Sequence, residues 1–251
     1  MKSSKILVLV FGSVLVMASC SKKSDPQPSL SSASLSLSTA QVVTFPASLS
    51  TSTDAHAQEA YSFVESVNAI GSFTGAFTVP SGATKTTTPI VGINVAGRIA
   101  ATQQNYLVYI WTDPNSASSV AYQVSETADS YTFELFYKDA GTTAWVRYLY
   151  AAEKKDKSSG FLNVYDPTVT KVSPAILSYN WVRGTNTFTF TVTDDLGSKV
   201  TLHTNTQTKV GDVEAYTSGI LIEKLTWDAQ GHGTWAVYDT DGITILSSGT
   251  W

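Results

Sequence analysis

The pattern that most constrains the fold is an alternation of apolar and polar residues that starts near residue 90 and continues through the rest of the chain. In 187–193, Phe188, Phe190 and Val192 alternate with threonines. Because successive side chains of a β-strand point to opposite faces of the sheet, such a segment predicts a strand with one apolar and one polar face. The segments that we interpret as strands are 105–112, 119–126, 131–138, 144–152, 161–165, 176–182, 187–193, 200–203, 213–217, 220–227, 234–239 and 243–250.

Short turn signals separate these segments. Examples are Asp139-Ala140-Gly141 and Asp241-Gly242, in which Gly provides the backbone freedom that a tight turn requires. Connections this short join antiparallel neighbours. We therefore expect a mainly β fold, a long antiparallel meander that forms a strongly curved sheet or an incomplete barrel, since open sheets of so many strands tend to curl. A β-sandwich is the alternative.

One helix is expected before the strands, over residues 54–70. Its apolar residues recur at spacings of three and four, which places them on one stripe of a helix. They are Ala57, Ala60, Tyr61, Val64 and Val67. Asp54 is the expected N-cap, because its carboxylate can accept hydrogen bonds from the free N–H groups of the first turn. We expect this helix to pack on the sheet through its apolar stripe.

The chain is weakly charged and slightly acidic. Of its 251 residues, 14% are charged, and 16 Lys and Arg against 20 Asp and Glu give a formal net charge of -4. Nucleic-acid-binding domains usually carry a basic patch, so we expect no nucleic-acid partner. The single Cys excludes an intramolecular disulfide and an all-cysteine zinc site.

The first twenty residues have the pattern of an export signal. Lys2 and Lys5 precede an apolar run from Ile6 to Met17, which is shorter than the about 20 residues that a membrane-spanning helix needs. A positively charged start followed by a short apolar run is typical of a secretory signal peptide. The run ends at Met17-Ala18-Ser19-Cys20, which contains the one cysteine of the chain.

This ending resembles the lipobox of bacterial lipoprotein precursors, with Met17 in place of the usual Leu. The resemblance implies removal of a signal peptide at 1–19 and lipidation of Cys20, by which acyl chains such as palmitate anchor the protein in a membrane. Together with the β-rich remainder, the chain is similar to uncharacterised β-rich surface or periplasmic lipoproteins of Bacteroidota. That similarity implies an outer-membrane lipoprotein of the cell envelope, facing the periplasm or the cell surface. A secreted protein with a free Cys is the alternative.

Residues 20–53 are expected to hold the lipidated Cys and a Ser/Thr-rich tether. The stretch 22–53 contains ten Ser and four Thr, and such a segment buries too little apolar surface to fold alone. A short strand that docks on the domain remains open in 34–45. We expect one β-rich domain over 54–251.

The sequence contains no motif of a catalytic or cofactor site. It lacks a GxSxG elbow, a Walker loop and a GxGxxG loop. His56, His203 and His232 have no metal-ligand spacing, and we interpret them as exposed polar residues. Carboxylates that could pair across strands are Glu126, Glu134, Glu153, Glu214 and Glu223. We expect no catalytic residue, no metal and no cofactor, and a protein that is not an enzyme.

Aromatic residues are the one compositional excess, with six Trp, twelve Tyr and ten Phe. Most of them are expected in the core. The segment 144–152 carries large side chains on both faces, so we expect something to cover both of its sides. Trp145, Tyr148 and Tyr150 in this segment are the candidate ligand-binding residues.

These observations predict a membrane-anchored lipoprotein with a non-enzymatic binding or structural domain. A curved sheet around a helix resembles, in architecture only, the lipoprotein-carrier type of half-barrel, which implies a small apolar or lipid ligand. A surface glycan-binding protein is the alternative, and a hydrolase is a third class. A continuous aliphatic cavity would fit a lipid, whereas a platform of Trp or Tyr rings beside Asn, Asp or Gln would fit a glycan.

Overall fold

The computed structural model describes residues 28–35, 43–70, 77–93, 105–113, 115–169 and 171–251. The expected signal peptide at 1–19 and the expected lipidation site Cys20 lie outside these residues. Both therefore stay predictions from the sequence.

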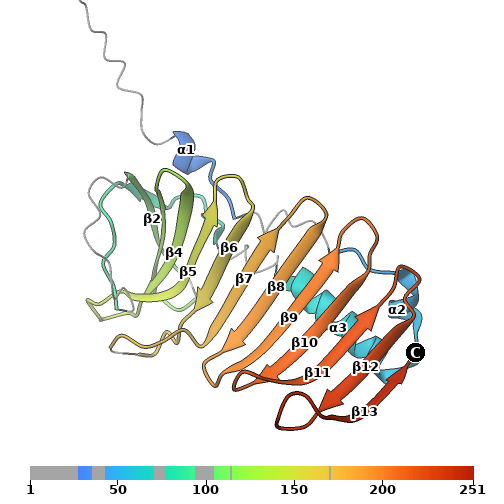
Figure 1. The fold of residues 1–251 in the computed structure, drawn as a ribbon. Coiled ribbons are helices and arrows are strands. Elements are labelled where there is room, and N and C mark those ends of the chain that lie inside the picture. Colours follow the sequence, from blue (N-terminus) through green and yellow to red (C-terminus); the bar gives the residue numbers. More distant parts are fainter. Residues whose placement is uncertain (1–27, 36–42, 71–76, 94–104, 114, 170) are drawn as a thin grey trace, which may run out of the picture.

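Thirteen antiparallel strands of the described chain form one open sheet, in which each strand pairs with the strands next to it in sequence (Figure 1). The strands are β1 (Thr84–Thr86), β2 (Asn105–Thr112), β3 (Ser119–Glu126), β4 (Ser130–Lys138), β5 (Val146–Lys154), β6 (Ser159–Val164), β7 (Leu177–Arg183), β8 (Thr187–Asp194), β9 (Ser198–Asn205), β10 (Gly211–Thr217), β11 (Ile220–Trp227), β12 (Gly233–Tyr238) and β13 (Ile245–Thr250). The sheet twists along its length and curls at its β2–β5 end. The predicted curved meander is confirmed, and the β-sandwich alternative is not found because every strand belongs to the same sheet.

The strand boundaries follow the alternation in the sequence closely. The predicted strands at 105–112, 119–126 and 220–227 coincide with β2, β3 and β11, and the other predicted strands differ from the structure by two residues or fewer at each end. β1 was not predicted, since Thr84–Thr86 has no apolar residue to alternate with. It is a strand because it pairs with β2, with Thr84 opposite Ile110.

The predicted helix is α3 (Ala55–Ile70), which lies across the strands of the C-terminal half of the sheet (Figure 1). Asp54 caps it as expected, since its Oδ1 accepts hydrogen bonds from the backbone N–H groups of His56 (2.9 Å) and Ala57 (3.3 Å). The buried residues of the helix are Ala57, Ala60, Val64, Val67 and Ile70. We call the face of the sheet that contacts α3 the inner face and the opposite face the outer face.

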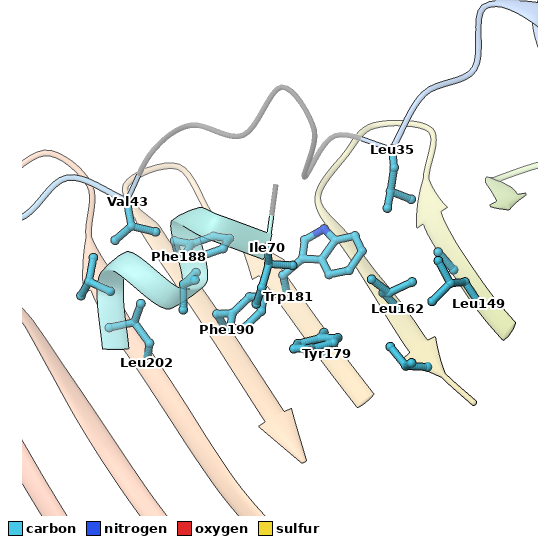
Figure 2. Close-up of a cluster of buried hydrophobic side chains, with 14 of the residues drawn as sticks. Leu35, Val43, Ile70, Leu149, Leu162, Tyr179, Trp181, Phe188, Phe190 and Leu202 are labelled. Carbon is cyan, nitrogen blue, oxygen red and sulfur yellow. The ribbon is translucent and has the colours of Figure 1, made fainter. Parts of the chain in front are cut away.

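The main hydrophobic core lies between α3 and the inner face. Figure 2 shows Ile70 at the end of the helix beside Tyr179 and Trp181 of β7, with Phe188 and Phe190 of β8 under the helix. Trp181 and Phe190 are almost completely buried. Because these side chains alternate with polar residues along their strands, one face of each strand supplies the core and the other meets solvent.

The stretch before the helix differs from the expected tether. Two short helices, α1 (Pro28–Ser31) and α2 (Ala47–Thr51), are present, and the apolar residues Leu30, Leu35, Val43 and Leu49 are buried in the main core. The backbone N–H of Val43 also donates a 2.7 Å hydrogen bond to Oδ1 of Asn68 in α3. The described part of 22–53 thus packs on the domain, because its few apolar residues find a ready-made apolar face that a Ser/Thr-rich segment could not build alone.

Tryptophan rings cover glycines on neighbouring strands of the sheet. The sequence repeats Gly233-Thr234-Trp235 as Gly249-Thr250-Trp251, and β12 and β13 pair so that Trp235 lies opposite Gly249. Trp251 reciprocally lies over Gly233, and a Cβ atom at Gly233 would come within 2.0 Å of that ring. Only glycine leaves room for a ring lying flat on the neighbouring strand, so the repeat encodes a reciprocal Gly–Trp pair. The same arrangement recurs for Trp181 over Gly160 and Trp227 over Gly211.

Replacing Val64 by Asp tests whether α3 is docked on the sheet. Val64 has no exposed surface, so the variant places an unpaired carboxylate in an apolar interface, at a cost of about 3 kcal/mol or more of stability. The urea midpoint of unfolding should fall sharply. Glu65→Ala, at the exposed neighbouring position, should leave the midpoint nearly unchanged. Equal midpoints for Val64→Asp and the wild type would mean that the helix is not part of the core.

Candidate functional site

The structure separates the three predicted ligand-binding residues. A β-bulge interrupts the pairing of β4 with β5 between Leu135 and Phe136, which leaves Tyr148 as an extra residue of β5. Tyr148 therefore shares the inner side with Leu149, whereas Tyr150 lies on the outer side against Phe161, with ring centroids 5.3 Å apart. Trp145 precedes β5, and the Nζ of Lys138 lies 4.8 Å from its ring centroid. The three residues do not form one site.

Both faces of β5 are covered, as the sequence suggested, and the outer cover is the chain itself. Residues 90–93 lie across the outer side of β3–β5, where the backbone N–H of Ile90 donates to Oε1 of Gln123 (2.7 Å) and Ile93 pairs with Val146. Beneath this segment, Gln123 donates to Glu134 (2.6 Å), and Arg147 contacts Glu134 and the Tyr165 hydroxyl, each at 3.3 Å. These contacts lie within the sheet and under the chain itself, which indicates a structural role, although the Nε of Arg147 is buried without a hydrogen-bond partner.

A cavity on the inner side of the curled end is the strongest candidate site. It consists of two adjoining hollows of about 600 and 740 Å³, which share Asp113, Tyr137 and Tyr148 as lining residues. We call it the tyrosine cavity. The rings of Tyr137 and Tyr148 meet edge to face with centroids 5.8 Å apart. The rest of the smaller hollow is lined by polar and apolar residues in equal number. The polar ones are Ser116, Ser118, Asp139, Thr142 and Thr168, and the apolar ones are Ile93, Ala144, Val146, Pro167 and Val169.

The meander itself brings these loops together. In an antiparallel sheet every second hairpin lies at the same end, so the connections β2–β3, β4–β5 and β6–β7 are neighbours. Asp113, Asp139 and Thr168 come from these three connections in turn. The larger hollow extends from there along the apolar side chains of Trp111, Val120 and Leu135. The cavity thus has a mouth of mixed polar and apolar residues with two carboxylates, Asp113 and Asp139, and an aromatic and apolar wall further along the strands.

The charges at the mouth are set by local hydrogen bonds. The backbone N–H of Asn115 donates to Asp113 at 3.0 Å and the Ser116 hydroxyl at 2.8 Å. These hydrogen bonds hold the pKa of Asp113 below its ordinary value, so its carboxylate is ionised at neutral pH. Burial raises the pKa of Tyr137, with smaller contributions from Tyr148 and Asp113, so that phenol stays neutral and able to donate. The mouth therefore offers a carboxylate acceptor beside aromatic rings.

Sequence reasoning identified Tyr148 but missed its companions Trp111 and Tyr137. Both residues were expected on strands, and nothing in their local pattern separates a cavity-lining ring from a core ring. What places them together is the pairing register of neighbouring strands, in which Val120 of β3 lies opposite both Trp111 of β2 and Tyr137 of β4.

Another hollow, of about 860 Å³, is an open trough on the outer face of β8–β12. Threonines such as Thr189 and Thr226 line it, together with His203 and Asp212, whose Nδ1 and Oδ2 lie 3.5 Å apart. Its aromatic lining residues Phe188 and Trp227 are buried in the main core. The trough offers a flat polar surface, and we regard the more enclosed tyrosine cavity as the better candidate.

The other residues with catalytic or ligating side chains have mixed environments. His232 is exposed and His203 is half exposed, which is close to the expectation of exposed polar residues. His56 differs from that expectation, because it is mostly buried and its ring stacks on Trp235. The five candidate glutamates contact five different partners. In the order Glu126, Glu134, Glu153, Glu214 and Glu223, these partners are Lys155, Arg147, Trp181, Lys224 and His56.

Comparisons with known proteins assign the chain to no family. Neither a protein-family model nor a curated protein matches the chain. Within the described residues, no helix has the length and apolar character needed to cross a membrane.

Proposed function

We propose that this chain is a lipid-anchored binding protein of the bacterial cell envelope whose tyrosine cavity holds a carbohydrate, and that it binds without catalysing a reaction. The observation that carries the carbohydrate proposal is the combination of Tyr137 and Tyr148 with the carboxylates of Asp113 and Asp139 around one hollow. The flat face of an aromatic ring packs against the C–H face of a sugar, and carboxylates accept hydrogen bonds from hydroxyl groups.

The carboxylates of Asp113 and Asp139 favour a carbohydrate over the apolar ligand that the sequence suggested first. A site for an acyl chain would gain little from two carboxylates, which must be desolvated when an apolar group covers them. The apolar part around Trp111, Val120 and Leu135 supports a lipid as the second candidate. The same apolar part also fits the less polar face of a sugar ring, so a carbohydrate could contact both the carboxylates and the apolar side chains of the cavity.

The anchor proposal rests on the sequence Met17-Ala18-Ser19-Cys20. Several acyl chains on Cys20, at about 0.8 kcal/mol per buried methylene, would hold the protein in a membrane stably. The weakly acidic charge would keep the domain itself from binding an anionic lipid surface. In this arrangement the cavity faces the aqueous side of the membrane, where soluble glycans are found.

The anchor is tested by replacing Cys20 with Ala. The variant should take up no label from a fatty-acid analogue and should keep its signal peptide, because the modified thiol and the cleavage signal are both lost. The wild type grown in the same culture conditions provides the positive control. Equal labelling of both proteins would contradict lipidation at Cys20.

The cavity is tested by glycan-array screening followed by calorimetry on the sugar that binds best. Tyr148→Ala removes one stacking ring and should weaken binding about fivefold, since one ring contributes on the order of 1 kcal/mol. Tyr150→Ala, on the opposite face of the same strand, is the matched control and should bind like the wild type. Native mass spectrometry of the purified protein provides the lipid arm. A co-purified acyl lipid without any glycan signal, or equal binding by Tyr148→Ala, would contradict the carbohydrate proposal.

A further inference from the structure

Three metal-ligating side chains meet where the first turn of α3 crosses β11. His56 and Glu59 are three residues apart on the helix and so lie on one side of it, and Glu223 comes from the inner face of β11. Nδ1 of His56 lies 3.8 Å from Oε1 of Glu223 and 3.9 Å from Oε2 of Glu59. One ligand atom from each of the three residues lies within 4.8 Å of the other two.

The imidazole of His56 is held in a fixed position with its Nδ1 turned toward the carboxylates. Its ring stacks on Trp235, with centroids 4.0 Å apart and planes 20° apart. Nδ1 is shielded from solvent and has no hydrogen-bond partner in the described structure, because both carboxylate oxygens lie beyond hydrogen-bond distance. A shielded polar atom without a partner is costly, so this geometry calls for something between the three groups.

The carboxylates of Glu59 and Glu223 both approach Nδ1 of His56, so two like charges lie close together. Like charges this close are relieved by a shared proton or by a cation. A proton shared by the two carboxylates would leave Nδ1 of His56 without a partner, and a proton on His56 would leave both of its contacts too long for hydrogen bonds. A cation placed among the three groups would contact all of them.

We propose that His56, Glu59 and Glu223 bind a divalent transition-metal ion, and that Zn²⁺ fits this set best. One imidazole nitrogen and two carboxylate oxygens are ligands that Zn²⁺ accepts, with a fourth position left for water. Mg²⁺ and Ca²⁺ prefer ligand sets made of oxygen alone. The bound ion clamps the start of α3 to β11, and this role is independent of what the tyrosine cavity binds.

The distances are close to those that Zn²⁺ needs. Bonds of about 2.0–2.2 Å in tetrahedral geometry place ligand atoms about 3.4 Å apart. The two distances from His56 must shorten by roughly half an ångström to reach that geometry. Glu59 is 54% exposed and free to move by this amount, while Trp235 keeps the imidazole in place.

The site is tested by titrating the purified protein with ZnCl₂ in a calorimeter, after treatment with EDTA. All variants carry Cys20→Ser, so that the thiol cannot bind the ion. We expect one ion per chain and a higher melting temperature with Zn²⁺ than with EDTA. Glu223→Gln should lower the affinity at least tenfold. It should not lower the melting temperature in EDTA, because it removes the repulsion between two carboxylates.

Controls separate this site from the other histidines. Glu65→Gln changes an exposed acid elsewhere on α3, and His203→Gln and His232→Gln remove the two other imidazoles; each should bind Zn²⁺ like the parent. The absence of saturable Zn²⁺ binding would overturn the proposal. Unchanged affinity in Glu223→Gln, or loss of binding in His203→Gln or His232→Gln, would overturn it as well.

Discussion

The fold depends on the contact between α3 and the inner face of the sheet. A single-layer sheet whose strands are apolar on one face must bury that face against another layer, and in the C-terminal half that layer is one helix. The buried stripe of the helix is small at its start, with Ala57 and Ala60, and branched toward its end, where Ile70 lies beside the ring of Trp181 (Figure 2). The leucines that precede the helix extend the cover along the sheet.

The two ends of the sheet are covered in different ways, and this difference places the candidate sites. At the β2–β5 end the sheet curls, residues 90–93 cover the outer face, and the inner face is left with the tyrosine cavity. Toward β13, tryptophan rings on the sheet itself provide part of the cover. Each ring of a Gly–Trp pair shields the backbone of the glycine that it crosses. At that same end Trp235 also holds His56 toward Glu223.

Much of the fold could be predicted from the sequence, because the spacing of apolar residues along the chain indicates where strands and the helix form. The alternation in 187–193 and the helical stripe after Asp54 gave β8 and α3 nearly to the residue. The bulge at Tyr148 could not be predicted, since it depends on the register with β4. Likewise, the approach of His56 to Glu223 joins residues far apart in the chain, and no local spacing signals it. The burial of Leu30 and Leu49 in a Ser/Thr-rich stretch was not predicted, because an average composition hides the few residues that pack.

The central claim, that the sheet and α3 form one cooperative unit, is tested most directly by native-state hydrogen exchange. If the inner face cannot stay folded without its cover, the slowest amides of α3 should exchange with the same free energy of opening as those of β8 and β9. That common value should match the free energy of global unfolding from urea titration. Amides of α3 that exchange several kcal/mol more easily, while β8 and β9 remain fully protected, would show that the sheet is stable alone and would contradict the account.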